Sequence, residues 1–442
     1  MSSPTPVATA LGRFVAETRW ASIPAAVRRE APRALLNHIS CALGVAQSPV
    51  VRGALVALRG FSGPAQATVF GQGVKLDAMS AAFVNCIAGN LLDYDDTHLA
   101  TVIHPAAPVA PVALALAEQR GLSGEAVLEA LLLGMEVECR IGLGVAPGHY
   151  DRGWHITSTT GVFGAAAAAA KLIGLDAART TDALGLAASQ SCGIIENLPN
   201  AGKNASMGNA ARNGILAALL AEAGWDAAPT AIEGRNGWAR AMGDAPDVAA
   251  MAGDLGTRWE AARITYKPYP AGIVFHAVIE AAMQLQGPAE EIAHVLVEGD
   301  ALLLKRGDRE VRTGGDSRVS IHHSVALGLV RQRAGVAEFE QAAVDDPALR
   351  DMRSRVEARC DPSLPRGAAR LTATRRDGTR QLVLVEHPTG SEANPMSDAA
   401  LEAKLRENLE IGGFAARGDA LVAALRGLEG SATTAELMAR LA

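Results

Sequence analysis

Apolar residues recur at intervals of three and four along most of the first 260 residues of this chain, for example at Leu128, Leu131, Leu132 and Met135. Such spacing places the apolar side chains on one face of an α-helix. No convincing period-two alternation of a β-strand interrupts it. The pattern therefore predicts that residues 7 to 260 are almost entirely helical.

Two of the expected helices are unusually rich in small residues. One runs from Gly164 through an alanine series to Leu175, with Gly174 as its C-terminal stop. The other runs from Ala210 to Ala221, and a polar segment that contains Lys203 precedes it. Smooth helix faces allow neighbours to approach closely, so we expect both helices to be central and buried.

The pattern changes after Lys267-Pro268-Tyr269-Pro270, because prolines interrupt helices. One helix is expected at 276–286, followed by strands at 294–298, 356–359, 370–374 and 381–385. The last two strands flank Asp377-Gly378, which predicts a hairpin with a type I′ turn.

The chain ends in helices, the first of which Ser397 caps. The sequence therefore predicts a mainly α protein with an α+β lid. A large all-helical domain comprises 1–264 and 395–442, and the smaller α+β domain, 265–394, is inserted before the C-terminal helices.

Composition and charge narrow the function classes. The chain has 442 residues, is 49% hydrophobic and only 4% aromatic, and carries a net charge of −6 without a basic stripe. These values favour closely packed helices and argue against nucleic acid as a partner. The N-terminus lacks the features of an export signal, no apolar run reaches the roughly 20 residues that span a bilayer, and five widely spaced cysteines indicate reduced thiols. We expect a cytoplasmic protein that does not bind a membrane.

A dense polar run, Asp93-Tyr94-Asp95-Asp96-Thr97-His98, is followed closely by His104-Pro105. Burying unpaired carboxylates is costly, so such density in an apolar chain favours a cleft in which these groups satisfy one another or a ligand. On a helix Asp93 and Thr97 would share a face, with Asp96 beside them. A solvated helix end with capping side chains is the alternative interpretation.

Cations and hydroxyls also gather where the two small-residue helices begin. Tyr150, Arg152 and His155 lie in a stretch just before one helix, and Lys203 lies before the other. Helix N-termini attract anions. Together with the polar run, these segments favour a small polyanionic substrate.

In this order the motifs resemble those of the MmgE/PrpD family, over nearly the whole chain. The motifs are Asp93-Tyr-Asp-Asp-Thr97-His98, His104-Pro105, Arg152-Gly-Trp-His155, Lys203 with Gly208-Asn-Ala-Ala, and Lys267-Pro-Tyr-Pro270. The resemblance implies a helical domain formed from both chain ends, an inserted lid, a homodimer, and an active site at the domain junction with no metal or organic cofactor. It further implies that the acid-binding site is lined by Asp93, Thr97, His104, His155 and Lys203.

Two positions depart from the decarboxylase-like members of that family. Gly272 replaces a histidine that follows their Lys-x-x-Pro segment, and His323 replaces a tyrosine of a later motif. Decarboxylation is therefore disfavoured. The segment from Lys267 to His276 looks more like the branch that contains the iminodisuccinate epimerase, with His276 interpreted as a core residue, whereas His322 and His323 are candidates to face the cleft.

We expect an enzyme that abstracts a proton alpha to a carboxylate of a small di- or tricarboxylic acid. A dehydratase-type lyase that breaks a carbon–oxygen bond is the main prediction, and a dicarboxylate epimerase is the alternative. Carboxylates would be bound by Lys203, Arg152, Lys267 and Thr97. His155 or His104 would exchange the proton beside Asp93, and the second acid would be His104, Tyr150 or His323.

Two other classes of protein remain open. A metal-dependent hydrolase could use Asp93, Asp96, His98 and His104 as ligands, although no His-x-x-x-His pair supports it. A non-catalytic helical scaffold would explain the polar runs as helix caps, but it gives no reason for Lys and His to gather at two helix N-termini.

Overall fold

The computed structural model describes residues 5–198 and 200–442. The chain divides into two compact units. Unit 1 holds the described residues up to Leu91 together with Asp95–Ile264 and Ser397–Ala442, and unit 2 holds Leu92–Tyr94 and Thr265–Met396. The predicted fold class, mainly α with a smaller α+β portion, is confirmed.

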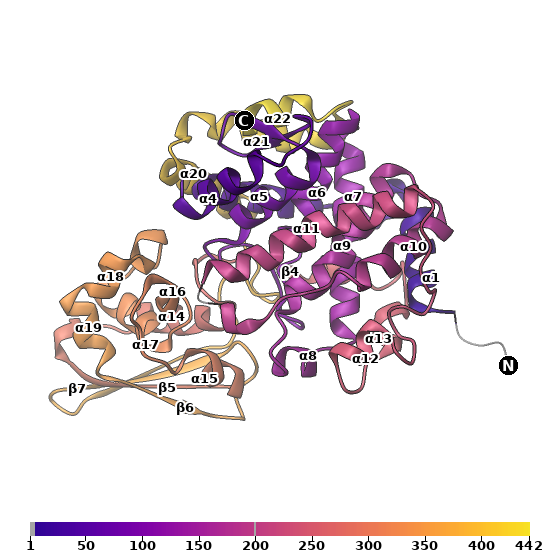
Figure 1. Cartoon of the computed structure of the whole chain (residues 1–442). Helices are drawn as coiled ribbons and strands as arrows, with labels where there is room; N and C mark the ends of the chain where they lie inside the picture. The colour runs from indigo at the N-terminus through magenta and orange to yellow at the C-terminus, as the bar shows by residue number, and fades with distance from the viewer. Residues whose placement is uncertain (1–4, 199) are drawn as a thin grey trace. The chain divides into compact units, whose positions relative to one another are not determined.

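Unit 1 is built almost entirely from helices (Figure 1). Its helices are α1 (Val7–Glu17), α2 (Ala25–Arg28), α3 (Glu30–Gly44), α4 (Pro49–Arg59), α5 (Ala78–Asn90), α6 (Ala106–Arg120), α7 (Gly124–Leu143), α8 (Gly148–Asp151), α9 (Ile156–Ile173), α10 (Ala177–Ala188), α11 (Ala201–Glu222), α12 (Trp238–Met242), α13 (Val248–Ala252), α20 (Asp398–Gly412), α21 (Gly418–Arg426) and α22 (Ala435–Leu441).

Short strands interrupt this helical region, contrary to the expectation of almost unbroken helix. β1 (Ala67–Val69) pairs antiparallel with β2 (Val74–Leu76), while β3 (Thr97–His98) and β4 (Ile264–Thr265) have two residues each. Strands of two or three residues are too short to produce a recognisable alternation, which explains why the sequence did not reveal them.

Helix α9 lies at the centre of unit 1 and packs against α7 and α11. Small residues permit the close approach: a Cβ added to Gly214 of α11 would lie 2.3 Å from the Cβ of Ala165 in α9. The helix ends at Gly174, whose φ of 82° is left-handed, so the predicted stop is confirmed. Helix α9 is almost fully buried, as predicted, whereas only half of the residues of α11 are buried.

The expectation that no apolar run could span a bilayer needs a correction at α9. Its 18 residues are long and apolar enough by length and composition. However, 89% of that window is buried inside the protein. In addition, the segment Ala25–Gly44, which holds α2 and α3, passes the same test only together with α4, and the two segments are bent by 92° relative to each other. Burial of this extent is the ordinary condition of a core helix, so α9 is weak evidence for a membrane.

The C-terminal segment returns to the first helices of unit 1, where α20 packs on α3. Ser397 caps α20 by accepting a hydrogen bond from the backbone N–H of Ala400, as predicted. Buried polar contacts join the two helices: Lys404 Nζ donates to Asn37 Oδ1 at 2.8 Å. A second bond runs from Asn408 Nδ2 to Ser40 Oγ at 2.9 Å.

Unit 2 contains a four-stranded sheet in the order β6-β5-β7-β8, with helices packed on it (Figure 1). β5 pairs parallel with β6 and antiparallel with β7, and β7 pairs antiparallel with β8. The strands are β5 (Ile292–Gly299), β6 (Val356–Cys360), β7 (Ala369–Arg375) and β8 (Arg380–Val385), and the helices are α14 (His276–Gln284), α15 (Ala301–Gly307), α16 (Gly314–Ser317), α17 (Ile321–Ala326), α18 (Gln341–Asp345) and α19 (Pro347–Arg353).

The predicted hairpin around Asp377-Gly378 is present, but the type I′ turn is wrong. Of these two residues only Gly378 has a positive φ, 86°, whereas a type I′ turn requires a positive φ at both central positions. The backbone N–H of Arg375 donates to the carbonyl of Thr379, which closes a three-residue loop. A left-handed glycine at the end of such a loop is the usual geometry of the next longer hairpin connection.

Candidate active site

The polar run lies outside helix, so the interpretation of Asp93 and Thr97 as neighbours on a helical face is wrong. Helix α5 ends at Asn90, Asp93 adopts a left-handed φ of 54°, and Thr97 lies in β3. Aspartate tolerates this backbone conformation better than most residues. The chain thus turns sharply between the helix and the strand.

The first part of the run, Leu92–Tyr94, belongs to unit 2. Lys267 Nζ contacts Asp93 Oδ1 at 2.6 Å and donates to the Asp93 carbonyl at 2.9 Å. The Tyr94 hydroxyl donates to the carbonyl of Pro268 at 3.0 Å. Two residues predicted to act at the site, Asp93 and Lys267, therefore form an ion pair in which a partly exposed carboxylate compensates a buried ammonium.

The second part of the run begins with Asp95, which is fully buried in unit 1. Both of its carboxylate oxygens accept from Asn90 Nδ2, at 2.9 and 2.8 Å. Its Oδ1 also lies 3.1 Å from Nδ1 of His104. Asn90 in turn accepts a bond of 3.5 Å from Asn204 of α11.

His104 is held on two further sides. Its Nδ1 lies 3.0 Å from the carbonyl oxygen of Asp96, and its backbone N–H donates to Thr157 Oγ1 of α9 at 3.1 Å. The side chain is 13% exposed. The imidazole is therefore fixed in direction while part of it stays accessible.

His155 stands at the N-cap position of α9, as expected. Its Nδ1 lies 2.6 Å from Ser158 Oγ, which is 2.8 Å from Ser206 Oγ in α11. Ser206 donates to the carbonyl of Lys203 at 2.8 Å. Lys203 was expected before this helix, but α11 begins at Ala201 and Lys203 occupies its first turn, buried to 6% exposure.

Together with the peptide bonds from Thr157 to Ser158 and from Lys203 to Asn204, these contacts close into a ring within unit 1, which we call the polar ring. Its members come from the end of α5, the loop before α6 and the first turns of α9 and α11, and they are Asn90, Asp95, His104, Thr157, His155, Ser158, Ser206, Lys203 and Asn204. The polar ring thus connects the backbone of His104, the imidazole of His155 and the backbone of Lys203, which are far apart in the sequence. Imidazoles and an ammonium are the groups that exchange protons with an anion and bind it.

Three other predicted site residues of unit 1 are not members of the polar ring. Thr97 is buried in β3, and Tyr150 of α8 is half-buried against a hydrophobic cluster. Arg152 has a side chain that is 43% exposed and forms an ion pair with Asp244. A substrate carboxylate would have to compete with Asp244 for this guanidinium.

His323 is buried in unit 2, among groups of that unit. Its Nε2 lies 2.9 Å from the Glu338 carbonyl, and Arg353 donates to its Nδ1 at 3.0 Å. Burial lowers the pKa of His323 to about 4, so the ring is neutral near pH 7. Its neighbour His322 pairs with Asp308, and His276 is fully buried beside Tyr269.

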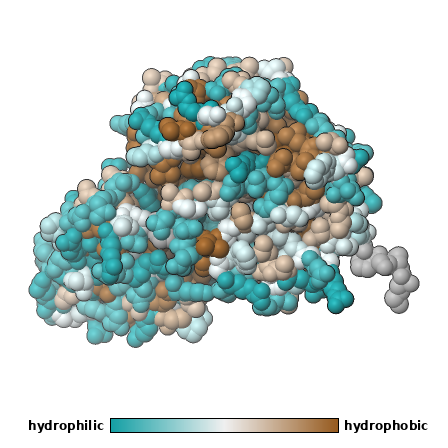
Figure 2. Space-filling view, in the orientation of Figure 1, coloured by the Kyte–Doolittle hydropathy of each residue, from teal (hydrophilic) through white to brown (hydrophobic). Residues whose placement is uncertain are grey.

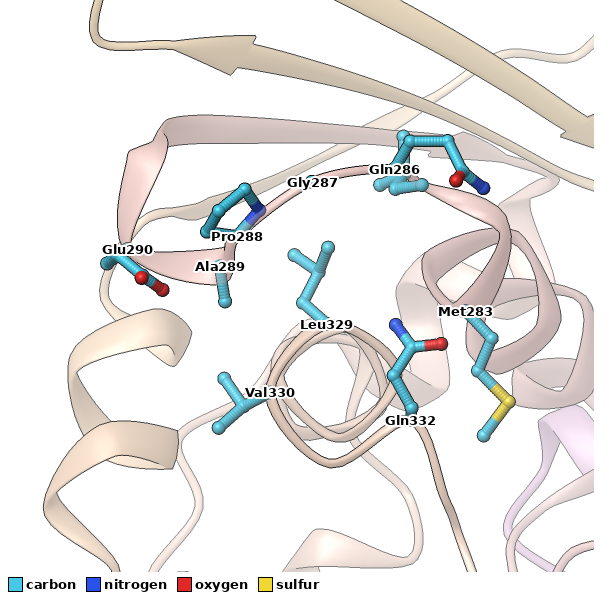
Figure 3. A pocket seen from close by; sticks show the side chains of 10 residues that line it. Met283, Gln286, Gly287, Pro288, Ala289, Glu290, Leu329, Val330 and Gln332 are labelled. Atoms are coloured by element: carbon cyan, nitrogen blue, oxygen red, sulfur yellow. The ribbon is translucent and has the colours of Figure 1, made fainter.

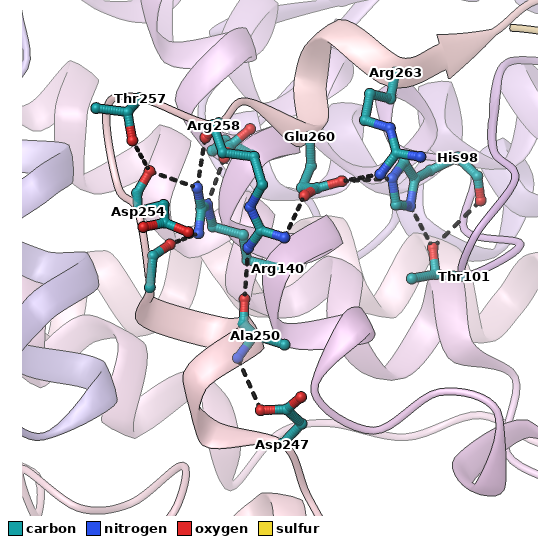
Figure 4. Close-up of polar contacts among 12 residues, drawn as sticks. His98, Thr101, Arg140, Asp247, Ala250, Asp254, Thr257, Arg258, Glu260 and Arg263 are labelled. Atoms are coloured by element: carbon teal, nitrogen blue, oxygen red, sulfur yellow. Dashed lines mark hydrogen bonds and ion pairs between the residues drawn. The ribbon is translucent and has the colours of Figure 1, made fainter.

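His98, one of the ligands in the metal interpretation, belongs to a separate buried network (Figure 4). Its Nδ1 contacts Thr101 at 2.8 Å and its Nε2 contacts Glu260 at 3.1 Å. The hydrogen bond from His98 lowers the pKa of the Glu260 carboxyl. Because both ring nitrogens are engaged, this histidine would have to break a buried contact to bind a metal.

The same network fastens the segment that precedes unit 2. Arg140 of α7 pairs with Glu136 and donates to the carbonyl oxygens of Gly253 and Arg258 (Figure 4). A fully buried guanidinium that gives bonds to backbone carbonyls fixes the course of a loop. The network is therefore an architectural element of unit 1.

Two family descriptions match this chain and together cover most of it. The MmgE/PrpD N-terminal domain matches residues 9–251, and the MmgE/PrpD C-terminal domain matches residues 269–425. The chain belongs to the MmgE/PrpD family.

Relatives of this MmgE/PrpD chain carry the names of enzymes. Cis-aconitate decarboxylase of Aspergillus terreus is 28% identical over 431 residues, which cover 88% of this chain and 87% of that protein. Cis-aconitate decarboxylase of Homo sapiens is 28% identical over 370 residues, or 79% and 76% of the two chains. The 2-methylcitrate dehydratase of Cupriavidus necator is 27% identical over 376 residues, or 77% and 75%.

A surface cavity of this MmgE/PrpD protein lies in unit 2, whereas the residues of the polar ring belong to unit 1. It has a volume of about 430 Å³, and Met283, Gln286, Leu329 and Val330 are among its lining residues (Figure 3). None of its ten lining residues is a lysine, arginine or histidine. The cavity therefore lacks the cations that an organic acid requires.

Sequence reasoning about this family member missed the residues that connect the predicted ones. Asn90 ends an apolar helix, Asp95 was one of three carboxylates in a run, and Ser158 and Ser206 are hydroxyls in polar helix starts. The available signal was their position at helix ends next to cationic residues. Their pairing depends on how α5, α9 and α11 cross, which no local pattern encodes.

Proposed function

We propose that this protein is an enzyme that removes a proton alpha to a carboxylate of a small di- or tricarboxylic acid, as a dehydratase-type lyase that uses no cofactor. The observation that carries the proposal is the polar ring, whose hydrogen bonds connect the residues His104, His155 and Lys203, the first and last through their backbones. Relatives named as decarboxylases and a dehydratase, aligned over most of their length, support a reaction of this class.

The proposed elimination divides the work between cation and imidazole. Lys203 holds a substrate carboxylate and stabilises the negative charge that develops next to it. One imidazole, His155 or His104, accepts the α-proton as the C–H bond breaks and the C=C bond forms. The other imidazole, or the phenol of Tyr150, protonates the hydroxyl that leaves as water. Atoms balance without a further reactant.

The remaining predicted residues receive supporting roles in this proposal. Thr97 donates a hydrogen bond to a substrate carboxylate. Lys267 binds a carboxylate only if that group displaces Asp93 from the ammonium. Arg152 contributes least, because it is exposed and paired with Asp244. His323 acts as a second acid only if the bonds that hold its ring neutral rearrange.

An epimerase is the second candidate. The segment from Lys267 to His276, with Gly272 in place of a histidine, favours it. In that reaction the two imidazoles lie on opposite faces of the α-carbon, and the second one returns a proton instead of assisting a leaving group. The same ring therefore serves either outcome.

The test is incubation of the protein with a panel of di- and tricarboxylic acids in deuterated water, followed by NMR. A hydroxy acid that yields a new alkene with loss of water supports the lyase. Deuterium at the α-carbon with inverted configuration and no alkene indicates the epimerase. Release of carbon dioxide from cis-aconitate would contradict both candidate functions and would indicate a decarboxylase, the activity that the names of several relatives describe. If no acid in the panel reacts or exchanges a proton, the proposal is refuted.

We further propose that the protein works in the cytoplasm. The cysteines are free thiols, with Cys41, Cys86 and Cys139 buried and Cys192 and Cys360 exposed. Unoxidised exposed thiols are usual in a reducing compartment. Cell fractionation with a tagged chain tests this, and recovery from an exported fraction would contradict it.

A homodimer is proposed as the working assembly, with no nucleic acid or membrane as partner. Hydrophobic surface lies over α4, α5 and α11 of unit 1 (Figure 2), and Val56 and Phe61 are 70% and 92% exposed. Contiguous apolar surface on a helical unit is typical of an interface between subunits. Light scattering on the wild type and on Phe61→Ser tests it: a monomeric wild type contradicts the proposal.

A further inference from the structure

The buried carboxylate of Asp95 and the imidazole of His104 form a pair whose geometry resolves which nitrogen carries the proton. Nδ1 of His104 lies 3.1 Å from Asp95 Oδ1 and 3.0 Å from the carbonyl oxygen of Asp96. A carbonyl oxygen only accepts hydrogen bonds. Nδ1 therefore carries a proton, and in the uncharged form of the ring the lone pair lies on Nε2.

The surroundings of Asp95 favour its ionised form, which accepts hydrogen bonds. Its two oxygens receive both bonds from the Asn90 amide, at 2.9 and 2.8 Å, and neither Asp95 nor Asn90 is exposed. A carboxylate that accepts from an amide and from an imidazole is stabilised as the anion. Burial in a low-dielectric interior makes this anion's effect on the neighbouring ring stronger.

The hydrogen bonds that hold Asp95 continue through Asn90 to α11, the helix that carries Lys203. Asn204, 2% exposed, donates to Asn90 Oδ1 at 3.5 Å, and it follows Lys203 directly in α11. The imidazole is thus connected through one carboxylate and two amides to the turn of α11 that carries Lys203. A carboxylate behind an imidazole is a recurrent way of fixing its tautomer and orientation.

We propose that Asp95 is a positioning residue that holds His104 in the Nδ1–H tautomer, so that Nε2 is the basic nitrogen presented for proton transfer, with Asn90 and Asn204 keeping Asp95 in place. This inference rests on the proposed function, because it assigns a chemical task to the histidine. Asp95 itself touches no reacting atom. It acts through His104 in both the forward transfer and its return.

The first measurement uses the wild-type protein without substrate. Nitrogen-15 labelling of the histidines and long-range NMR correlation report the tautomer of each ring, and the resonance missing from His104→Gln identifies His104. We expect Nδ1–H. An Nε2–H tautomer at this position overturns the proposal whether or not any variant folds, and it does so independently of the substrate assay.

The second measurement compares Asp95→Asn with Asp96→Asn. Asp95→Asn keeps the shape of the side chain, but the new amide can donate to Nδ1, so the tautomer of His104 should reverse and kcat should fall about 10²- to 10⁴-fold with KM changed less than about threefold. Asp96→Asn removes a neighbouring buried carboxyl and keeps the backbone carbonyl that contacts Nδ1, so the tautomer should stay. Unchanged kcat and tautomer in Asp95→Asn overturn the proposal.

Failure of the proposed function has a different result. If no acid in the panel exchanges a proton while the wild type shows Nδ1–H and Asp95→Asn reverses it, then the pairing of Asp95 with His104 stands and the reaction assigned to it is wrong. Asn90→Ala adds an independent check, because it keeps the carboxylate of Asp95 but removes the amide that donates hydrogen bonds to it. It should lower kcat less than Asp95→Asn does.

Discussion

Ser158 of α9 and Ser206 of α11 join their hydroxyls at 2.8 Å, and this contact links the helix that begins at His155 to the helix that begins beside Lys203. Ser158 also contacts His155 Nδ1, and Ser206 donates to the Lys203 carbonyl. Two short side chains therefore connect the ring of a proposed base, His155, to the backbone of a proposed anion-binding residue, Lys203. Misplacement of either by a small distance is costly for proton transfer.

Replacing Ser158 with alanine should lower turnover about tenfold and unfolding free energy by about 1 kcal/mol, because the His155 ring loses its partner. Steady-state kinetics and urea unfolding measure the two effects. Thr160→Ala is the matched control: its hydroxyl is also buried in α9, but among the described residues it bonds only to the carbonyl of Ile156. Equal losses of turnover in both variants would mean that Ser158 matters only for folding.

Lys203 and His155 should separate kinetically. Lys203→Ala removes the cation that holds the substrate, so KM should rise at least about tenfold. His155→Gln keeps a polar side chain but removes the base, so kcat should fall at least about 10²-fold with KM little changed. The measurement is the full kinetic profile on whichever acid the panel identifies. Wild-type constants in both variants would remove these residues from the site.

Close packing between α9 and α11 predicts opposite effects of the same substitution at two glycines. A Cβ at Gly214 would lie 2.3 Å from Ala165 Cβ and 2.6 Å from the backbone nitrogen of Ala166. Gly214→Ala should therefore force the helices apart and cost about 1–3 kcal/mol. Gly53, within α4, has no atom within 4 Å of such a Cβ, so Gly53→Ala should stabilise by up to about 1 kcal/mol. Thermal unfolding compares them, and a neutral Gly214→Ala contradicts the packing argument.

Local patterns were sufficient for several elements of the fold. Gly174 and Ser397 mark helix boundaries through backbone conformation and side-chain capping, which depend on a few adjacent residues. The hairpin at β7 and β8 followed from alternation around a turn. Its turn type was wrong, because the loop closes at Arg375 and Thr379 and not next to Asp377.

The candidate site was less accessible to such reasoning. The residue types of the polar run were informative, but a helical geometry was assumed where Asp93 has a left-handed φ. That conformation coincides with the change of unit at Leu92–Tyr94, which depends on contacts with Lys267 and Pro268, 174 residues away. Asp95 and Ser158 acquire partners only from other helices, so their roles could not be read from neighbouring residues.

Two buried carboxyl groups of unit 1 predict an unusual dependence of the unfolding free energy on pH. Asp96 and Glu138 are fully buried, and Asp96 Oδ1 and both Glu138 oxygens have no hydrogen-bond partner within the described residues. Burial raises the pKa of Asp96 to about 8, with the charge of Asp95 as a second cause. Burial likewise raises the pKa of Glu138 well above its ordinary value, and Asp96 adds to this shift. Asp96 therefore stays protonated in the folded protein at pH 7, and the shift of Glu138 acts in the same direction.

In the unfolded chain Asp96 loses its proton near the ordinary pKa of 3.8, whereas the folded protein keeps it to about pH 8. The folded state binds more protons between these limits, so this group lowers the unfolding free energy by up to about 1.4 kcal/mol per pH unit as pH rises through that window. Asp96→Asn keeps an oxygen acceptor for the Ala106 N–H and cannot ionise. It should gain stability relative to wild type as pH rises from about 5 to about 8, measured by urea unfolding at each pH. Asp77→Asn is the control: hydrogen bonds lower the pKa of Asp77, so removing this carboxylate should give no such gain in stability. If the unfolding free energies of the wild type and of Asp96→Asn change in parallel with pH, then Asp96 is ionised in the folded protein.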